Sequence, residues 1–414
     1  MRRVRWMGGL MAALGGAALA AGCGASASAE NHVAGRRLTV YVSAPFAGSS
    51  ASDARAVVGG VQIALDAAHH HEGRYRIALR VLDDATAKSG GWDPGQTSAN
   101  ARRAAADPST IGYIGEIDSG ASAVSIPLLN GAGIPQISPT STAVGLTTGG
   151  AGAFPGEPEK YYPTQRRTFI RLAPDDAVQA AVQRQAQIEA GCRRTAVLED
   201  GDIDGRDAAL TFAALARRSS LRVIGPEPFA AADDRAAAAS AARSGADCVL
   251  VAGLDDHAAA RLSERIAAAA PGTMLFGWSG LAAPAYVDPA AGGIPGWLAP
   301  QLVLTDPGLG TSGQPPAERR FALAYARRYG PPPSAAVYGY EAMSLLLDAI
   351  RRVTGFGRGE AGRAAVLAAL LHTRDRHSAL GTYSVERDGD TTLHRYGVYR
   401  VRDGHLVFWK AMAS

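Results

Sequence analysis

Residues 111–142 read IGYIGEIDSGASAVSIPLLNGAGIPQISPTST. The first part of this stretch, 111–117, is made of apolar residues, glycine and one acid, which predicts a buried strand. Residues 134–137 form a second short apolar run, and the small polar residues at 118–122 predict that a helix begins between the two. The order strand, helix, strand predicts a parallel pair, because the helix returns the chain to the same edge of the sheet.

Hydroxyl groups follow both strands of this unit. Ser119 and Gly120 stand where the first backbone N–H groups of the helix would be unpaired, a position that binds anions such as a carboxylate. Ser141 and Thr142 follow the second strand. Ordinary helix caps and loops would carry the same residues, so the pattern alone leaves both interpretations open. Open α/β sheets bind ligands at this edge, which makes it the first candidate site.

The first 22 residues differ from the rest of the chain. Three arginines precede an uncharged apolar run, which is typical of a secretory signal and too short for a comfortable membrane span. Cys23 follows an Ala-Gly pair and resembles the lipidated cysteine of bacterial lipoproteins, although Leu19 stands one place upstream of the usual position. We expect lipidation at Cys23. The alternative is a secreted protein with an unmodified cysteine. Residues 23–35 are expected to form a flexible tether.

The composition is that of a globular protein. The chain has 414 residues, of which 47% are hydrophobic and 19% charged, and it is long enough for two domains. The net charge of +4 falls to +1 without the leader, because the leader contains three arginines and no acid. No basic block follows, so we do not expect nucleic acid as a partner.

Strand and helix patterns alternate through residues 38–143 and again through 169–277. This repetition predicts two Rossmann-like α/β lobes with mostly parallel sheets. Near the C-terminus, 394–402 and 405–409 alternate apolar and polar residues, which predicts an antiparallel pair joined by a turn at Asp403-Gly404.

Cys192 and Cys248 each stand just before an apolar run. If both runs are parallel strands of one sheet, the two sulfurs could meet, and a disulfide is permitted outside the cytoplasm. Two buried thiols fit equally well, because spacing alone does not fix the Cα separation.

The motifs of catalysis are missing from the sequence. It contains no dinucleotide or Walker loop, no nucleophile elbow and no zinc-protease motif, so we expect neither an enzyme nor a cofactor. The loop 200–205 fits the first half of a calcium loop, but Thr211 stands where the bidentate glutamate belongs, so we expect no metal there. A solvated loop or a cleft edge is favoured. Two lobes behind a lipoprotein signal indicate capture of a small molecule in a cleft.

From about residue 36 to 410, the chain resembles the leucine/isoleucine/valine-type substrate-binding proteins of ABC importers, which have the type I periplasmic-binding fold. The matching segments are Leu38–Ser43 with Ala44-Pro45-Phe46-Ala47-Gly48, Leu82-Asp83-Asp84, Gly115 with Ser119, Ile137–Thr142 through Leu146-Thr147, Tyr162-Pro163 to Arg171, and Ala336–Ala342.

The resemblance implies that the chain crosses between the lobes three times, near 174, 297 and 386. The first lobe (the N-lobe) would then combine 36–173 with 298–385. The second lobe (the C-lobe) would combine 174–297 with 386–414.

The resemblance also implies a ligand site. In that family, the loops matching 118–120 and 141–142 hold the ligand's carboxylate and amine, and Phe46 would line the apolar part. The second lobe departs from the pattern. Asp204 replaces a frequent tyrosine, and Gly277-Trp278-Ser279-Gly280 replaces a segment that usually carries an acid. Asp204 would then face the amine, with Trp278 and Ser279 beside it. Trp278 could equally be a packed core residue.

The resemblance implies a lipid-anchored, extracytoplasmic and monomeric solute-binding protein. It would deliver an amino acid or similar small carboxylate to an ABC importer permease. One alternative is a sensory or regulatory lipoprotein of the same fold. Another is a wall-associated enzyme or an activator of one, and the missing catalytic motifs weigh against the enzyme.

Overall fold

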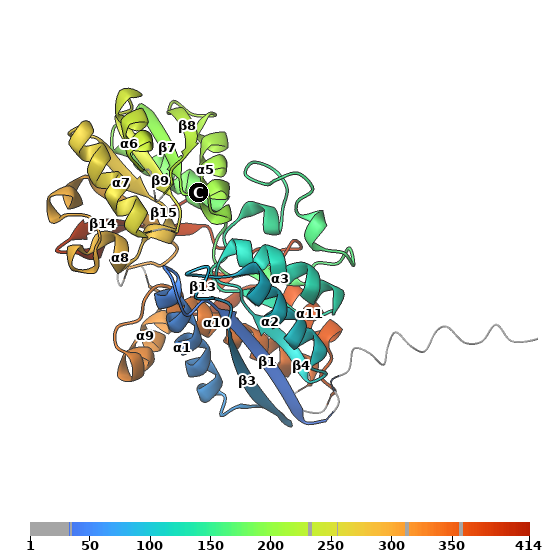
Figure 1. Cartoon of the computed structure of the whole chain (residues 1–414). Coiled ribbons are helices and arrows are strands. Elements are labelled where there is room, and N and C mark those ends of the chain that lie inside the picture. The colour runs from blue at the N-terminus through green and yellow to red at the C-terminus, as the bar shows by residue number, and fades with distance from the viewer. Residues whose placement is uncertain (1–32, 34, 231–233, 255, 311–313, 356–358) are drawn as a thin grey trace, which may run out of the picture.

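The computed structural model describes residues 33, 35–230, 234–254, 256–310, 314–355 and 359–414, which form two lobes, each built on one large sheet (Figure 1). The signal 1–22, Cys23 and the tether up to residue 32 lie outside the described residues. Val33 is buried, and its N–H donates to the carbonyl of Ala361 at 3.1 Å. The folded domain therefore begins before the predicted end of the tether.

The described part of the first lobe contains a six-stranded sheet in the order β2-β3-β1-β4-β5-β6, in which the β2–β3 pair is antiparallel and the other pairs are parallel. Its strands are β1 (Arg37–Ala44), β2 (His71–Glu72), β3 (Tyr75–Asp83), β4 (Thr110–Ile114), β5 (Gln136–Ser138) and β6 (Phe169–Arg171). A two-stranded ribbon, β12 (Arg376–Ser378) and β13 (Gly381–Tyr383), adds to this lobe.

Helices cover both faces of this sheet because successive residues of a strand point to opposite sides. Leu38, Val40 and Val42 of β1 pack into the core under one helix group, and Tyr41 packs into the smaller core under the other. The first group is α1 (Ala51–Ala67), α9 (Pro316–Tyr329), α10 (Ala335–Val353) and α11 (Arg363–Leu371), and the second is α2 (Pro94–Ala106) and α3 (Ser119–Gly131).

Two glycines allow α1 and α10 to pack backbone against backbone. A Cβ at Gly60 would clash with the carbonyl of Ala336, and a Cβ at Gly339 would clash with the carbonyl of Val57. Residues far apart in the sequence are thereby joined in one core, which ties 316–385 to the first lobe.

The second lobe contains, in its described part, a seven-stranded sheet in the order β15-β14-β11-β10-β9-β7-β8. The strands from β8 to β11 are parallel, and β14 and β15 are antiparallel to their neighbours, with the turn at Asp403-Gly404, as predicted. The strands are β7 (Arg194–Glu199), β8 (Arg222–Pro228), β9 (Cys248–Ala252), β10 (Met274–Gly277), β11 (Leu302–Asp306), β14 (Arg395–Arg402) and β15 (His405–Ala413).

Helices also cover both faces of the second sheet. The core on one side includes residues of α4 (Asp176–Glu189) and α5 (Ile203–Ala216), and the core on the other includes residues of α6 (Asp234–Arg243), α7 (Asp256–Ala269) and α8 (Pro284–Val287). None of the helices that the structure describes has the length and hydrophobicity needed to cross a bilayer.

The second crossover lies later than predicted. Strand β11 pairs with β10 and β14 in the second sheet, whereas the boundary at 298 places it in the first lobe. The chain leaves the second sheet only after Asp306 and enters the first lobe at α9. The reason is that a short apolar run shows that a strand is buried, but not in which sheet.

A fully buried arginine joins two of the crossovers. Arg171, at the end of β6, donates from Nε and Nη2 to the two carboxylate oxygens of Asp390, both at 3.0 Å, and from Nη1 to the carbonyl of Ala143 at 2.6 Å. The backbone N–H of Arg171 also donates to the carbonyl of Gly389 at 2.9 Å. The last connection between the lobes is therefore fixed against the first.

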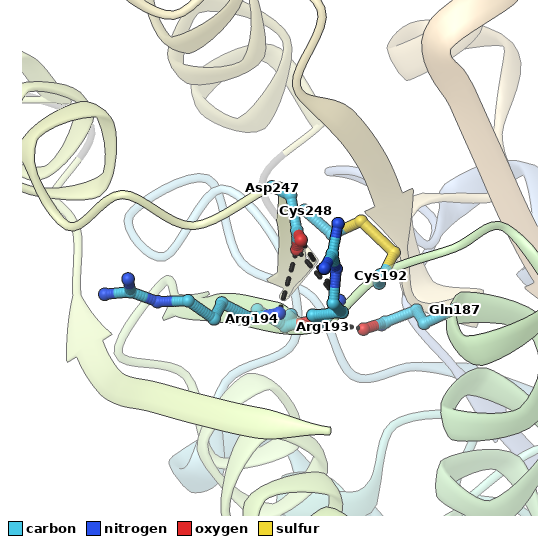
Figure 2. Close-up of a disulfide and its surroundings, with 7 residues drawn as sticks. Gln187, Cys192, Arg193, Arg194, Asp247 and Cys248 are labelled. Atoms are coloured by element: carbon cyan, nitrogen blue, oxygen red, sulfur yellow. Dashed lines mark hydrogen bonds between the residues drawn. A yellow bond between two sulfur atoms is a disulfide. The ribbon is translucent and has the colours of Figure 1, made fainter. Parts of the chain in front are cut away.

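The structure joins Cys192 and Cys248 in a disulfide with Cα atoms 5.8 Å apart (Figure 2). Cys248 begins β9, which pairs with the neighbouring strand β7 through Thr195. The adjacent Asp247 accepts the backbone N–H groups of Arg193 and Arg194, which holds the two strand starts together. The parallel neighbours that the sequence left conditional thus bring the two cysteines within bonding distance.

We expect the double variant Cys192→Ala/Cys248→Ala to lower the free energy of unfolding by about 2–4 kcal/mol, because the cross-link closes a long loop in the unfolded chain. The two cysteines are 56 positions apart in the sequence. Urea unfolding of the oxidised protein and the variant measures the difference. The oxidised protein treated with reductant should behave like the variant. Equal midpoints for all three samples would contradict the prediction.

Candidate functional site

Each of the two sheets has a position where its strand order reverses. In the first sheet, β1 lies between β3 and β4, so the chain continues first on one side of β1 and then on the other. In the second sheet, β7 lies between β8 and β9 in the same way. Loops after such strands diverge and leave a crevice. A cavity of about 510 Å³ lies there, lined from the first lobe by Ser50 and Asp118 and from the second by Asp204 and Leu254.

Four of the residues predicted from the sequence line this cavity: Thr142, Asp204, Trp278 and Ser279. The indole N–H of Trp278 donates to Asp176 at 3.0 Å, and the hydroxyl of Ser279 donates to Gln179 at 2.9 Å. Hydrogen bonds to residues of α4 therefore fix both side chains. Trp278 is at once buried and part of the cavity wall.

Ser119 and Gly120 lie at the N-terminus of α3, as predicted, and a carboxylate occupies that N-terminus. The carboxylate belongs to Asp204 of the opposite lobe, whose oxygens accept the backbone N–H groups of Ser119 at 2.9 Å and Gly120 at 3.3 Å. The hydroxyl of Ser119 accepts the backbone N–H groups of Thr142 and Ala143, so it holds the neighbouring loop in place.

Ser141 and Phe46 lie outside the cavity lining. The Ser141 hydroxyl is buried, lies 2.8 Å from that of Ser122 and donates to the carbonyl of Glu116. Phe46 packs against the core of the first lobe, and its backbone N–H donates to Asp83 at 3.0 Å. Both residues follow the carboxyl ends of the expected strands, but their side chains stabilise the loops from inside.

A second contact between the lobes comes from the same helix as Asp204. Asp207, one turn further along α5, accepts the backbone N–H of Val144 at 3.1 Å. Residues three apart on a helix share a face, so α5 presents both carboxylates to the first lobe.

Sequence reasoning missed Asp118 as a cavity residue. Its side chain is buried, with 5% exposure; one carboxylate oxygen accepts the hydroxyl of Ser50 at 2.8 Å, and the other has no hydrogen-bond partner. Burial, and then the charge of Asp204, raise the pKa of Asp118 well above its usual value. The resemblance placed residue 118 in a ligand-holding loop, but only Ser119 and Gly120 of that loop were named as site residues, because an acid directly after a buried strand was interpreted as a helix cap.

Three further acids of the cavity were missed: Asp53 of α1, Asp306 at the second crossover and Glu318 of α9. Asp306 accepts the backbone N–H of Gly308 at 2.7 Å and the hydroxyl of Ser334 at 3.2 Å, and burial raises its pKa to about 6. Burial raises the pKa of Glu318 to about 7. Asp306 and Glu318 lie in the range 298–385, in which the sequence analysis named no site residue.

The loop 200–205 uses its carboxylates within the protein. Asp202 caps α5 by accepting the N–H of Asp204 at 3.0 Å, and Asp200 accepts the backbone N–H of Leu254 at 2.6 Å. Over the described residues, no group of three or more histidine, cysteine, aspartate or glutamate side chains is placed to hold a metal ion.

The sequence matches the family described as periplasmic binding protein over residues 38–405. A search of the curated proteins gave no match.

Solved structures show the same arrangement of lobes. A leucine binding protein, LivK, from Thermotoga maritima superimposes with a TM-score of 0.75 at 22% identity, covering 91% of this chain and 99% of the other. LivJ from Streptococcus pneumoniae, in complex with isoleucine, gives 0.73 at 18% identity, with 91% and 99% covered. A solute binding protein from R. palustris, in complex with benzoate, gives 0.71 at 19% identity, with 91% and 98% covered.

The raised pKa of Asp306 makes stability depend on pH. The folded state holds this proton more tightly than the unfolded state, so the contribution is fully present below about pH 4 and is lost as the pH rises to about 6. The unfolding free energy of the wild type should fall by up to about 3 kcal/mol over that range because of this carboxyl. Asp306→Asn should remove this fall. Urea unfolding at several pH values measures it. Identical pH slopes for variant and wild type would show that the carboxyl titrates alike in both states.

Proposed function

Because the chain belongs to the periplasmic binding protein family, we propose that it is an extracytoplasmic solute-binding protein that captures a small organic molecule between its lobes and delivers it to an ABC importer. The observation that carries this proposal is the cavity of about 510 Å³ at the strand-order reversals of both sheets. A cavity of that size suits a small-molecule ligand.

Closure of the lobes around the ligand would be the signal that the importer reads. Asp204 and Asp207 make polar contacts with backbone N–H groups of the first lobe. Polar contacts between lobes are exchanged for water at little cost, which suits a hinge that opens and closes.

Amino acids are the first ligand class to test. LivJ binds isoleucine and the R. palustris protein binds benzoate, so this fold accommodates both aliphatic and aromatic ligands of similar size. The wall of the present cavity combines apolar residues such as Trp278 and Phe321 with acids and hydroxyls, which suits a ligand with an apolar body and a polar group.

We expect a bound ligand to raise the Tm of the mature domain, residues 24–414, by the equivalent of about 2.7 kcal/mol at a hundredfold excess over Kd. Ala282→Trp, which fills part of the cavity, should abolish the shift, whereas Ala290→Trp, on an exposed position of the same segment, should preserve it. A panel of amino acids, amines, amides, carboxylates and purines provides the ligands. A shift that survives Ala282→Trp would place binding outside the cavity.

The membrane anchor is proposed from Cys23. We expect the full chain expressed in a bacterium to sediment with membranes and to incorporate radiolabelled palmitate, and Cys23→Ser to lose the label. Ser28→Ala, in the tether beyond the lipidation position, is the control and should keep it. An unlabelled wild-type protein in the soluble fraction would contradict the anchor.

A further inference from the structure

The cavity between the lobes is strongly acidic. Five carboxylates line it, and no lysine, arginine or histidine appears among the described residues of its wall; the five are Asp53, Asp118, Asp204, Asp306 and Glu318. Arg319 is the nearest cation along α9, and its guanidinium donates to the backbone carbonyl of Gln314. Carboxyl groups gathered in this way disfavour an anionic ligand and favour a cation, which stabilises their ionised forms.

The place where a ligand carboxylate would bind is already filled. A helix N-terminus is the natural acceptor of such a group, and at α3 the N–H groups of Ser119 and Gly120 donate to Asp204. A second carboxylate there would have to displace Asp204 and would then stand beside Asp118. The protein thus supplies from its own chain the anion that this helix end accepts.

Asp118 lacks the partner that a buried carboxylate requires. Its second oxygen has no hydrogen-bond partner although the residue lines the cavity and is only 5% exposed. Ser50 satisfies the first oxygen, while Asp84, Asp202 and Asp204 contribute only negative charge. An ammonium group would provide both a donor and the opposite charge.

We infer that the cavity takes a small organic cation, an amine whose ammonium group binds Asp118 and which needs no carboxylate of its own. The inference rests on the proposed function and narrows its ligand class. Trp278, Phe321 and Val337 in the same wall provide the apolar surface for the body of the amine.

Proton release accompanies this binding. Burial and neighbouring acids raise the pKa of Asp118, and the cation lowers it again. Affinity for the amine therefore rises with pH until Asp118 is ionised in the free protein. The proton released appears in calorimetry as a dependence of the binding heat on the buffer.

Matched ligands test the inference by calorimetry on the mature domain. Isoamylamine, leucinamide, leucine and isocaproate share an isobutyl group, and benzylamine and benzoate share a phenyl ring. We expect the amines and the amide to bind and the carboxylates without an amine not to bind. Asp118→Asn should lower the affinity for the amines about ten- to a hundredfold. Glu264 is an exposed acid on α7, and Glu264→Gln should leave that affinity unchanged. Binding that requires the carboxylate overturns the inference and leaves the proposed function intact.

A tethered cation makes the test independent of the ligand chosen. Ser49 lines the cavity and is exposed, so Ser49→Lys offers an ammonium group to the acids, and Ser49→Met has similar length without the charge. We expect a higher Tm for the lysine variant than for the methionine variant, and no such difference in the Asp118→Asn background. If lysine gives no advantage and no amine binds, the inference fails. The proposed function fails only if the wider panel of amino acids, amides, carboxylates and purines also gives no shift in Tm.

Discussion

The architecture depends on Arg171, a fully buried cation at the point where the chain first leaves the first lobe. Its guanidinium binds Asp390 through two hydrogen bonds, and its backbone binds Gly389, so two connections separated by more than half the chain lie together. Removing one partner of a buried ion pair costs about 3–5 kcal/mol, because the other charge is left without compensation. This pair therefore holds the first and last connections between the lobes side by side.

Across the cleft between the lobes, helix α5 makes two polar contacts with the first lobe. Asp204 and Asp207 project from α5 toward backbone N–H groups at α3 and at Val144. Neither contact uses an apolar surface, and polar interfaces within a chain permit relative motion. Asp204 therefore belongs both to the wall of the cavity and to the contact between the lobes.

Much of this arrangement was visible in the sequence, and the rest was not for identifiable reasons. Alternating strand and helix patterns are local, so both α/β lobes and the final antiparallel hairpin were predicted. The sheet to which Leu302–Asp306 belongs depends on distant pairing, which local hydrophobicity does not encode. At the site, Asp204 was singled out by its position, yet its bonds to Ser119 and Gly120 required the two lobes to be placed. Asp118 lies in a loop that was expected to hold the ligand, but it was not named as a site residue because the same residue type caps ordinary helices.

The interleaving of the two lobes along the chain also shapes how the molecule is made. The core of the first lobe includes residues up to Val385, and the sheet of the second lobe includes β14 and β15 near the C-terminus. During synthesis, neither lobe can reach its final packing until nearly the whole chain is available. Contacts between segments so far apart form slowly, and the incomplete intermediates expose apolar strands. Incomplete intermediates of this chain are therefore exposed for longer than those of two consecutive domains would be.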